Sequence, residues 1–234
     1  MPYHVAMPRL SDRRVATIFA LVLASGFCVS LVAVRSSRAG TDGYGFLVWN
    51  LILAWIPFLL AIAFYDGFRR GFSSLGLAAV GALWLLFLPN APYMVTDLVH
   101  LGAIPGAPLW FDGAMISAFA ATGLLLGLGS VILVHAVALR VLGRLLGWVA
   151  LLPVLCLCSL GVLLGRFGRL NSWDIVARPA RLGDVLAVRL ADPLGNGRAV
   201  AAAVAYAAFL ALAYLVLYTL SSLRLELEQG KVRR

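Results

Sequence analysis

Six long apolar runs restrict the folds open to this sequence. A transmembrane helix needs about 20 mostly apolar residues, and such runs cover residues 16–34, 45–65, 73–88, 113–139, 145–165 and 199–220. Hydrophobic residues make up 62% of the chain and charged residues 12%, against about half and about a quarter in soluble domains. The sequence therefore predicts one all-α, polytopic membrane domain over residues 1–234. We expect a bundle of about six transmembrane helices with short interfacial helices.

The basic residues between the apolar runs indicate how the chain is oriented. The chain has 19 Lys and Arg against 10 Asp and Glu, and short cytoplasmic segments are enriched in Lys and Arg. Placing the N-terminus in the cytoplasm puts 11 basic residues inside and 8 outside, six of them in the long segment 166–198. Long segments follow the rule less strictly. We therefore expect both termini in the cytoplasm and membrane lipids, not nucleic acid, as partners.

A first polar segment follows the third apolar run. Pro89 and Pro92 end the membrane helix, and Asn90 is suited to start a short amphipathic helix as its N-cap. Residues at i, i+4 and i+7 of that helix share one face. They are Tyr93, Asp97 and His100, with Met94, Leu98 and Leu101 on another face.

The same segment ends at the start of the fourth run with Trp110 and Asp112. Asp112 is in position to cap the fourth helix. No Lys or Arg stands between Arg70 and Arg140, so neither Asp112 nor Asp97 has a base nearby in the sequence. Their counterions must come from another segment.

A second polar segment joins the fifth and sixth runs and supplies basic residues. Its first part contains Arg166, Arg169, Asn171, Trp173 and Asp174, and residues 180–190 have the pattern of an interfacial amphipathic helix. Because successive spans alternate direction, the two polar segments lie on the same side of the membrane. Asn50, near the start of the second run, lies close to that side. We therefore predict that Asp97 contacts Arg166 or Arg169, directly or through a ligand.

The ordered motifs in these segments resemble a known family. They are Pro89-Asn90-Ala91-Pro92-Tyr93, Thr96-Asp97-Leu98, His100-Leu101, Pro108-Leu109-Trp110-Phe111-Asp112, Gly165-Arg166-Phe167 and Asn171-Ser172-Trp173-Asp174. Together they resemble the bacterial integral membrane family called domain of unknown function 1361, over roughly residues 45–220. The resemblance implies a multi-span protein of the bacterial plasma membrane and implies no activity. Phe111 stands where the family motif has a tyrosine.

Other chemical features of the sequence are weaker. Asp97 and His100 are close enough to bind one metal ion, and Asp112 and Asp174 could complete its ligand set, but this spacing is a weak signal and an ion pair is favoured. His135 lies 23 residues after Asp112, about 34 Å along a helix, and is interpreted as an interfacial histidine. No motif in the sequence assigns a cofactor or an enzymatic reaction.

Three hypotheses for the function remain. The first is binding or processing of an anionic lipid or envelope precursor at the extracytoplasmic interface. The alternatives are a small transporter or channel, and a structural or assembly subunit of a membrane complex. The first predicts an outward-facing pocket for an anionic ligand, with the two tryptophans at headgroup level. The candidate residues are Asn90, Tyr93, Asp97, His100, Asp112, Arg166, Arg169, Asn171, Trp173 and Asp174, with Trp110 at the rim.

Overall fold

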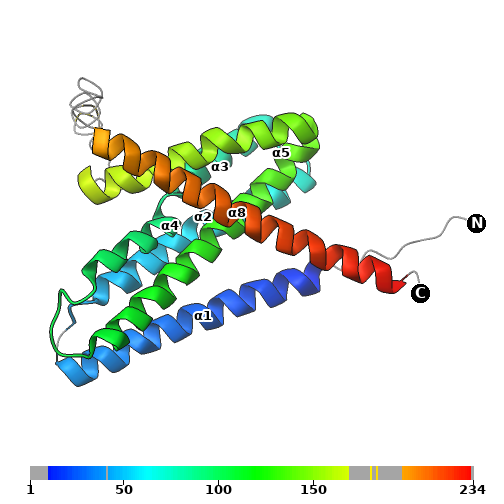
Figure 1. Cartoon of the computed structure of the whole chain (residues 1–234). Coiled ribbons are helices and arrows are strands. Elements are labelled where there is room, and N and C mark those ends of the chain that lie inside the picture. The colour runs from blue at the N-terminus through cyan, green and yellow to red at the C-terminus, as the bar shows by residue number, and fades with distance from the viewer. Residues whose placement is uncertain (1–9, 41, 169–179, 181–182, 184–196, 233–234) are drawn as a thin grey trace, which may run out of the picture.

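The computed structural model describes residues 10–40, 42–168, 180, 183 and 197–232, and in this part of the chain every regular element is a helix. The elements are α1 (Leu10–Ala39), α2 (Gly45–Arg69), α3 (Ser74–Phe87), α4 (Asn90–Tyr93), the 3₁₀ helix η1 (Met94–His100), α5 (Leu109–Gly168) and α8 (Gly197–Val232). Figure 1 shows them in one bundle. Arg169, Asn171, Trp173 and Asp174, and the amphipathic helix expected after them, lie outside the described residues.

Helix α5 folds back on itself and accounts for two of the predicted spans. As a straight helix its 60 residues would measure about 90 Å, far more than the roughly 30 Å of a bilayer core. Gly143 breaks it with φ 79° and ψ 174°, a backbone conformation that glycine adopts without steric cost. The rings of His135 and Trp148 consequently approach to 4.8 Å between centroids, and Figure 1 shows the chain reversing there.

The helices agree with a membrane bundle of about six crossings. Five are long and apolar enough to cross a membrane, and α5 is one of these five. The start of α1 and the end of α8 lie toward the same side of the view in Figure 1. We call the end formed by residues 40–50, 97–112 and 166 the site end. The opposite end, with Gly71 and Gly143, is the hairpin end.

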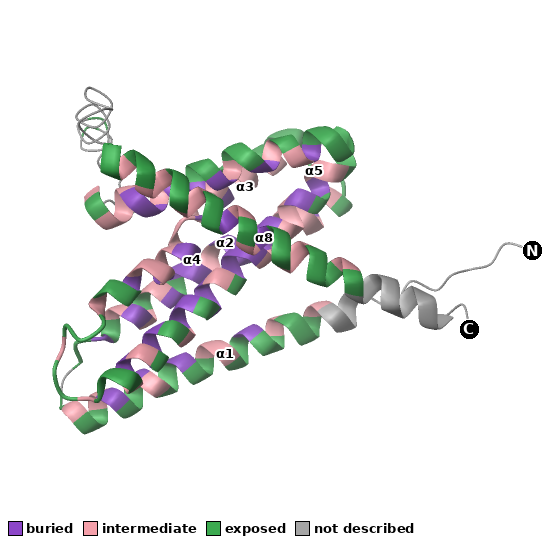
Figure 2. Cartoon of the chain, viewed as in Figure 1, coloured by how far each residue is buried: buried purple, intermediate pink, exposed green. Residues whose placement is uncertain are grey.

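Buried residues concentrate at the centre of the bundle, on α2 and the first arm of α5 (Figure 2). One core includes Leu47, Met115 and Phe119, and a second includes Trp84 and Leu210. Helices α1 and α8 instead expose many large apolar side chains. Such surfaces suit lipid, where apolar side chains cost nothing to expose.

The break after α3 packs against the first arm of α5. A Cβ added at Gly123 would lie 2.6 Å from the carbonyl oxygen of Ala91, and one at Gly127 would lie 3.1 Å from the Cβ of Ala91. The two glycines thus allow α4 to lie directly on the helix, the packing role that small residues have between membrane helices.

Two details of the first polar segment were predicted wrongly. Asn90 is not an N-cap, because Pro89 holds that position and the Asn90 amide donates to the carbonyl oxygen of Phe87 at 3.0 Å. The following residues form a 3₁₀ helix, which has three residues per turn. Met94 therefore shares a face with Asp97 and His100, while Leu98 and Leu101 stay exposed. The sequence analysis assumed α-helical spacing and for that reason placed Met94 on the face of Leu98 and Leu101.

Candidate functional site

The carboxylate of Asp97 lies at the centre of the site end and meets side chains from two other helices. Its side chain is 1% exposed. The amide of Asn50, on α2, donates to Oδ2 at 2.9 Å, and Nη1 of Arg166, at the end of α5, lies 3.6 Å from Oδ1. This confirms the predicted contact between Asp97 and Arg166 and the contribution of Asn50. The ion pair supplies the base that is missing near Asp97 in the sequence.

His100 holds the same nitrogen of Arg166. Nη1 of Arg166 lies 3.1 Å from Nε2 of His100. A guanidinium can only donate hydrogen bonds, so Nε2 must be the accepting nitrogen and the imidazole is neutral, with its proton on Nδ1. One NH2 group of Arg166 therefore faces both Asp97 and His100.

The rest of the Arg166 guanidinium is open. Its side chain is 18% exposed, and within the described residues Nη2 and Nε have no hydrogen-bond partner. Asp97 and His100 thus fix one corner of a planar donor group and leave its other edge available. Such an edge can bind a phosphate or carboxylate through two parallel hydrogen bonds.

A second ion pair at the site end is closed. Nε of Arg35, at the end of α1, lies 3.2 Å from Oδ1 of Asp112, and the two side chains are 0% and 2% exposed. Nη2 of Arg35 also donates to the carbonyl oxygens of Ile104 at 2.7 Å and Pro105 at 3.2 Å. The counterion of Asp112, which has no base nearby in the sequence, therefore comes from α1 and not from the segment after α5.

Tyr44 connects this closed pair to His100. Its ring lies under the guanidinium of Arg35, 4.6 Å from ring centroid to Cζ, and its hydroxyl donates to the carbonyl oxygen of His100 at 3.0 Å. Burial and then the negative charge of Asp112 raise the pKa of Tyr44, so the phenol stays protonated and keeps donating. Sequence reasoning missed Arg35 and Tyr44. Arg35 had one available signal, since it follows the first run directly on the same side as Asp112.

The structure brings only part of the predicted residue set together. Asp97, His100 and Arg166 meet as described. Asn90 caps the end of α3 and Tyr93 is half-buried at the end of α4. Trp110, 74% exposed at the start of α5, stands at the outer rim of the site end.

The described residues contain no metal-binding cluster. No three His, Cys, Asp or Glu side chains converge among them. Both oxygens of Asp97 and the Nε2 nitrogen of His100 are engaged by Asn50 and Arg166.

His135 is buried within the protein, on the first arm of α5 before the reversal at Gly143. It is 3% exposed, and its Nδ1 lies 2.6 Å from the hydroxyl of Tyr214. The rings of Trp148, Tyr214 and Tyr218 surround it, with centroids 4.8, 5.7 and 6.0 Å away. We call these four residues the aromatic cluster. Among the described residues, the buried Nε2 of His135 has no hydrogen-bond partner. The reversal at Gly143 and the packing of α8 create this setting, which the local sequence does not reveal.

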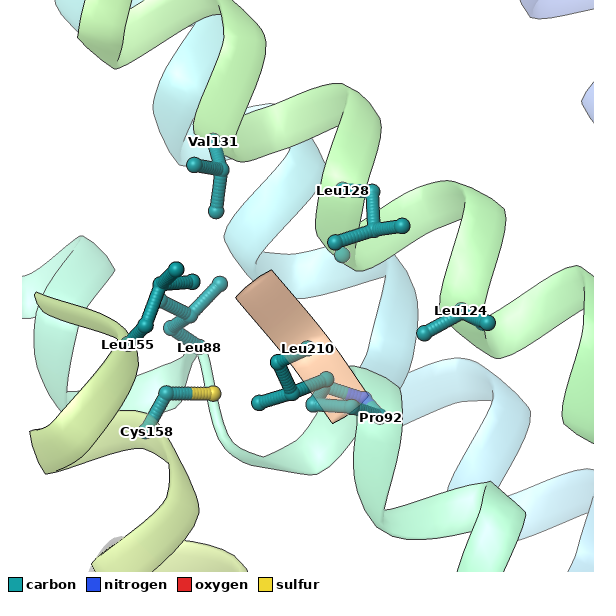
Figure 3. Close-up of a pocket in the computed structure, with 9 residues that line it drawn as sticks. Leu88, Pro92, Leu124, Leu128, Val131, Leu155, Cys158 and Leu210 are labelled. Carbon is teal, nitrogen blue, oxygen red and sulfur yellow. The ribbon is translucent and has the colours of Figure 1, made fainter. Parts of the chain in front are cut away.

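A small apolar cavity of about 10 Å³ lies among α3, α4, the two arms of α5 and α8 (Figure 3). Leu88, Pro92, Leu155, Cys158 and Leu210 are among the side chains around it. A cavity this size has room for about one water molecule, and water needs polar partners. We therefore interpret this cavity as a small packing defect and not as a ligand site.

Comparison with known proteins places the chain in a family. The family described as "Protein of unknown function (DUF1361)" matches residues 49–219, which include Asn50, Asp97, His100 and Arg166, but neither Arg35 nor Tyr44. No curated protein and no solved structure matches the chain significantly. Since the match covers most of the chain, this membrane protein belongs to the DUF1361 family.

Proposed function

We propose that this protein binds the phosphate of an anionic lipid, or of a lipid-linked envelope precursor, at the extracytoplasmic side of a bacterial plasma membrane. Arg166 is the residue that receives the phosphate. Asp97, Asn50 and His100 hold Arg166 in place from behind and do not themselves need to touch the lipid.

The open edge of Arg166 carries this proposal. An arginine placed only to neutralise Asp97 would be expected to turn its paired edge to the carboxylate, as Arg14 does with Asp66, where two nitrogens contact the two oxygens at 2.8 and 2.9 Å. Arg166 instead presents a single nitrogen to Asp97 and His100. Its remaining donors match the bidentate geometry of a phosphate.

The surroundings of Arg166 fit a ligand that arrives from the lipid. Trp110, Val99 and Leu109 expose most of their side chains at the same end of the bundle. Exposed tryptophan is typical of the headgroup level of a membrane. A ligand with a phosphate and an apolar tail satisfies both the guanidinium and this apolar rim.

Native mass spectrometry of the purified chain can test the proposal. Phosphatidylglycerol, a polyprenyl phosphate, phosphatidylcholine and inorganic phosphate serve as separate probes. Replacing Arg166 by glutamine should weaken binding of the two anionic lipids about tenfold or more, since charge-assisted hydrogen bonds contribute about 1.5–3 kcal/mol each and 1.4 kcal/mol is tenfold. The matched control is Arg140→Gln, an exposed arginine outside the site end.

The arms of this experiment separate the outcomes. Preference for the polyprenyl phosphate over phosphatidylglycerol identifies an envelope precursor, and equal binding identifies a general anionic lipid. Equal binding of inorganic phosphate would move the proposal from a lipid to a soluble anion. If Arg166→Gln and Arg140→Gln bind both lipids as the unaltered chain does, the proposed function is wrong and the Asp97–Arg166 pair only fastens the helices together.

A further inference from the structure

Two aromatic side chains at the start of α2 contact His100. The hydroxyl of Tyr44 donates to the backbone carbonyl oxygen of His100 at 3.0 Å. The ring of Phe46 meets the imidazole edge to face, with centroids 5.1 Å apart and planes at 66°. The backbone and the side chain of His100 are therefore each held by a separate contact.

The position of His100 determines the direction of Arg166. Nη1 donates to Nε2 of His100 at 3.1 Å, a shorter separation than the 3.6 Å to the carboxylate of Asp97. A rotation of the imidazole would remove this acceptor, and the guanidinium could then turn its free edge toward Asp97. The open edge on which the proposed function depends thus needs a fixed imidazole.

Tyr44 is itself fixed, which makes it a rigid support. Its side chain is fully buried, and the guanidinium of Arg35 covers its ring at 4.6 Å. Arg35 is in turn held by Asp112 and by the carbonyl oxygens of Ile104 and Pro105. Rigid support of this kind is what keeps a binding group in its productive geometry.

We propose that Tyr44 and Phe46 are positioning residues for the headgroup site, which hold His100 so that Arg166 presents its open edge to the phosphate. The proposal rests on the proposed function. It adds to the site two residues outside the family match at 49–219, neither of which touches the ligand.

A double-mutant cycle with phosphatidylglycerol as the probe tests this role. Tyr44→Phe removes one hydroxyl and keeps the ring under Arg35. It should weaken binding about three- to tenfold, the effect of losing one hydrogen bond. In the Arg166→Gln background the same change should have no further effect, because its influence passes through Arg166. Phe46→Leu should show the same coupling from the other contact, and Tyr218→Phe, in the aromatic cluster, is the matched control.

The outcomes separate the two proposals. If Arg166→Gln weakens binding and both α2 variants bind as the unaltered chain does, the positioning role is wrong and the proposed function stands. Equal loss in both backgrounds also overturns the role, since it shows an effect that does not pass through Arg166. If Arg166→Gln itself has no effect, both proposals fail.

Nitrogen NMR of labelled histidine gives a second readout that a merely structural role would not change. The unaltered chain should show His100 protonated on Nδ1, with Nε2 accepting a hydrogen bond. Tyr44→Phe and Phe46→Leu should shift the Nε2 resonance of His100 and leave that of His135 in place. A His100 resonance that stays unchanged in both variants, or that shows Nε2 protonated in the unaltered chain, contradicts the proposal.

Discussion

His100 and His135 lie near opposite ends of the same bundle and are held in different ways. His100 is half-buried and accepts a hydrogen bond from a charged arginine that is partly open to its surroundings. His135 is almost fully buried, among aromatic rings and against a tyrosine hydroxyl. The same side chain therefore serves a charged assembly at the site end and a closed aromatic assembly at the hairpin end.

The comparison shows where ligand chemistry can arise in this fold. At the site end, charged and polar groups from α2, η1 and α5 meet, and Nη2 and Nε of Arg166 have no partner within the part of the chain that the structure describes. In the aromatic cluster, rings of α5 and α8 pack on one another, with Trp148 and Tyr218 only 5.1 Å apart between centroids. The ring contacts join the two arms of α5 to α8 near the turn at Gly143. The proposed binding therefore concerns the site end, and the aromatic cluster is interpreted as packing.

The largest expected contrast is in access to water on the two sides of the membrane. In a chain whose three native cysteines are replaced by alanine, Ala103→Cys marks the site end and Ser74→Cys the hairpin end; both positions are exposed. A membrane-impermeant maleimide added to intact cells should label Ala103→Cys and reach Ser74→Cys only after the membrane is opened. Gly106, in the same loop as Ala103, is unsuitable for a cysteine, because its φ is +113° and an added Cβ would lie 2.8 Å from that of Ala39. The reverse labelling pattern would place Arg166 in the cytoplasm.

The next effect compares the closed ion pair with the open one. Arg35→Met removes one partner of a fully buried pair and should lower the free energy of unfolding by about 3–5 kcal/mol. Arg166→Met should cost less, because its guanidinium is partly exposed and Asn50 still donates to the buried carboxylate of Asp97 after the change. Unfolding of the purified protein in mixed detergent micelles measures both values, with Arg38→Met, an exposed arginine on α1, as the control. Equal losses for Arg35→Met and Arg166→Met would show that the two pairs do not differ as described.

The smallest effect separates the two histidines directly. His135→Ala should lower the free energy of unfolding by about 2–4 kcal/mol, since it leaves a hole among three rings, and should not alter binding of phosphatidylglycerol. His100→Ala should cost about 1 kcal/mol of stability, the size of one hydrogen bond, and should weaken that binding. Denaturation gives the free energy of unfolding of each of the two variants, and native mass spectrometry of the same preparations gives their phosphatidylglycerol binding. If His135→Ala loses the lipid while remaining folded, the hairpin end takes part in binding and the contrast drawn above is wrong.

The bundle follows from local patterns to a large extent. The six apolar runs match α1, α2, α3, the two arms of α5 and α8. Alternation of spans places the two polar segments on one side, and Asp97 has no base nearby in the sequence. Together these two points were enough to predict that Asp97 contacts Arg166 or Arg169, and the structure shows Arg166. Such patterns succeed because lipid imposes length and apolarity on every span.

The details that failed depend on contacts between distant segments. The pairing of Asp112 with Arg35 joins residues 77 apart, and no periodicity encodes that choice over an arginine of segment 166–198. His135 is surrounded by rings 13, 79 and 83 positions away in the chain. The 3₁₀ form of η1 changes the repeat from 3.6 to 3.0 residues, which moved Met94 to the buried face.

The break after α3 also has a consequence for how the protein is made. Helix α3 has 14 residues, about 21 Å, and is too short to cross the bilayer core of roughly 30 Å alone. The segment that continues α3 packs against residues that are synthesised later. They are Gly123 and Gly127 in the first arm of α5 and Gly161 in the second arm. The hydroxyl of Tyr206, in α8, also donates to the Pro92 carbonyl oxygen at 2.7 Å. While the chain is still being translated these supports do not exist. We therefore expect the third crossing to reach its final packing only after both arms of α5 and then α8 have been synthesised.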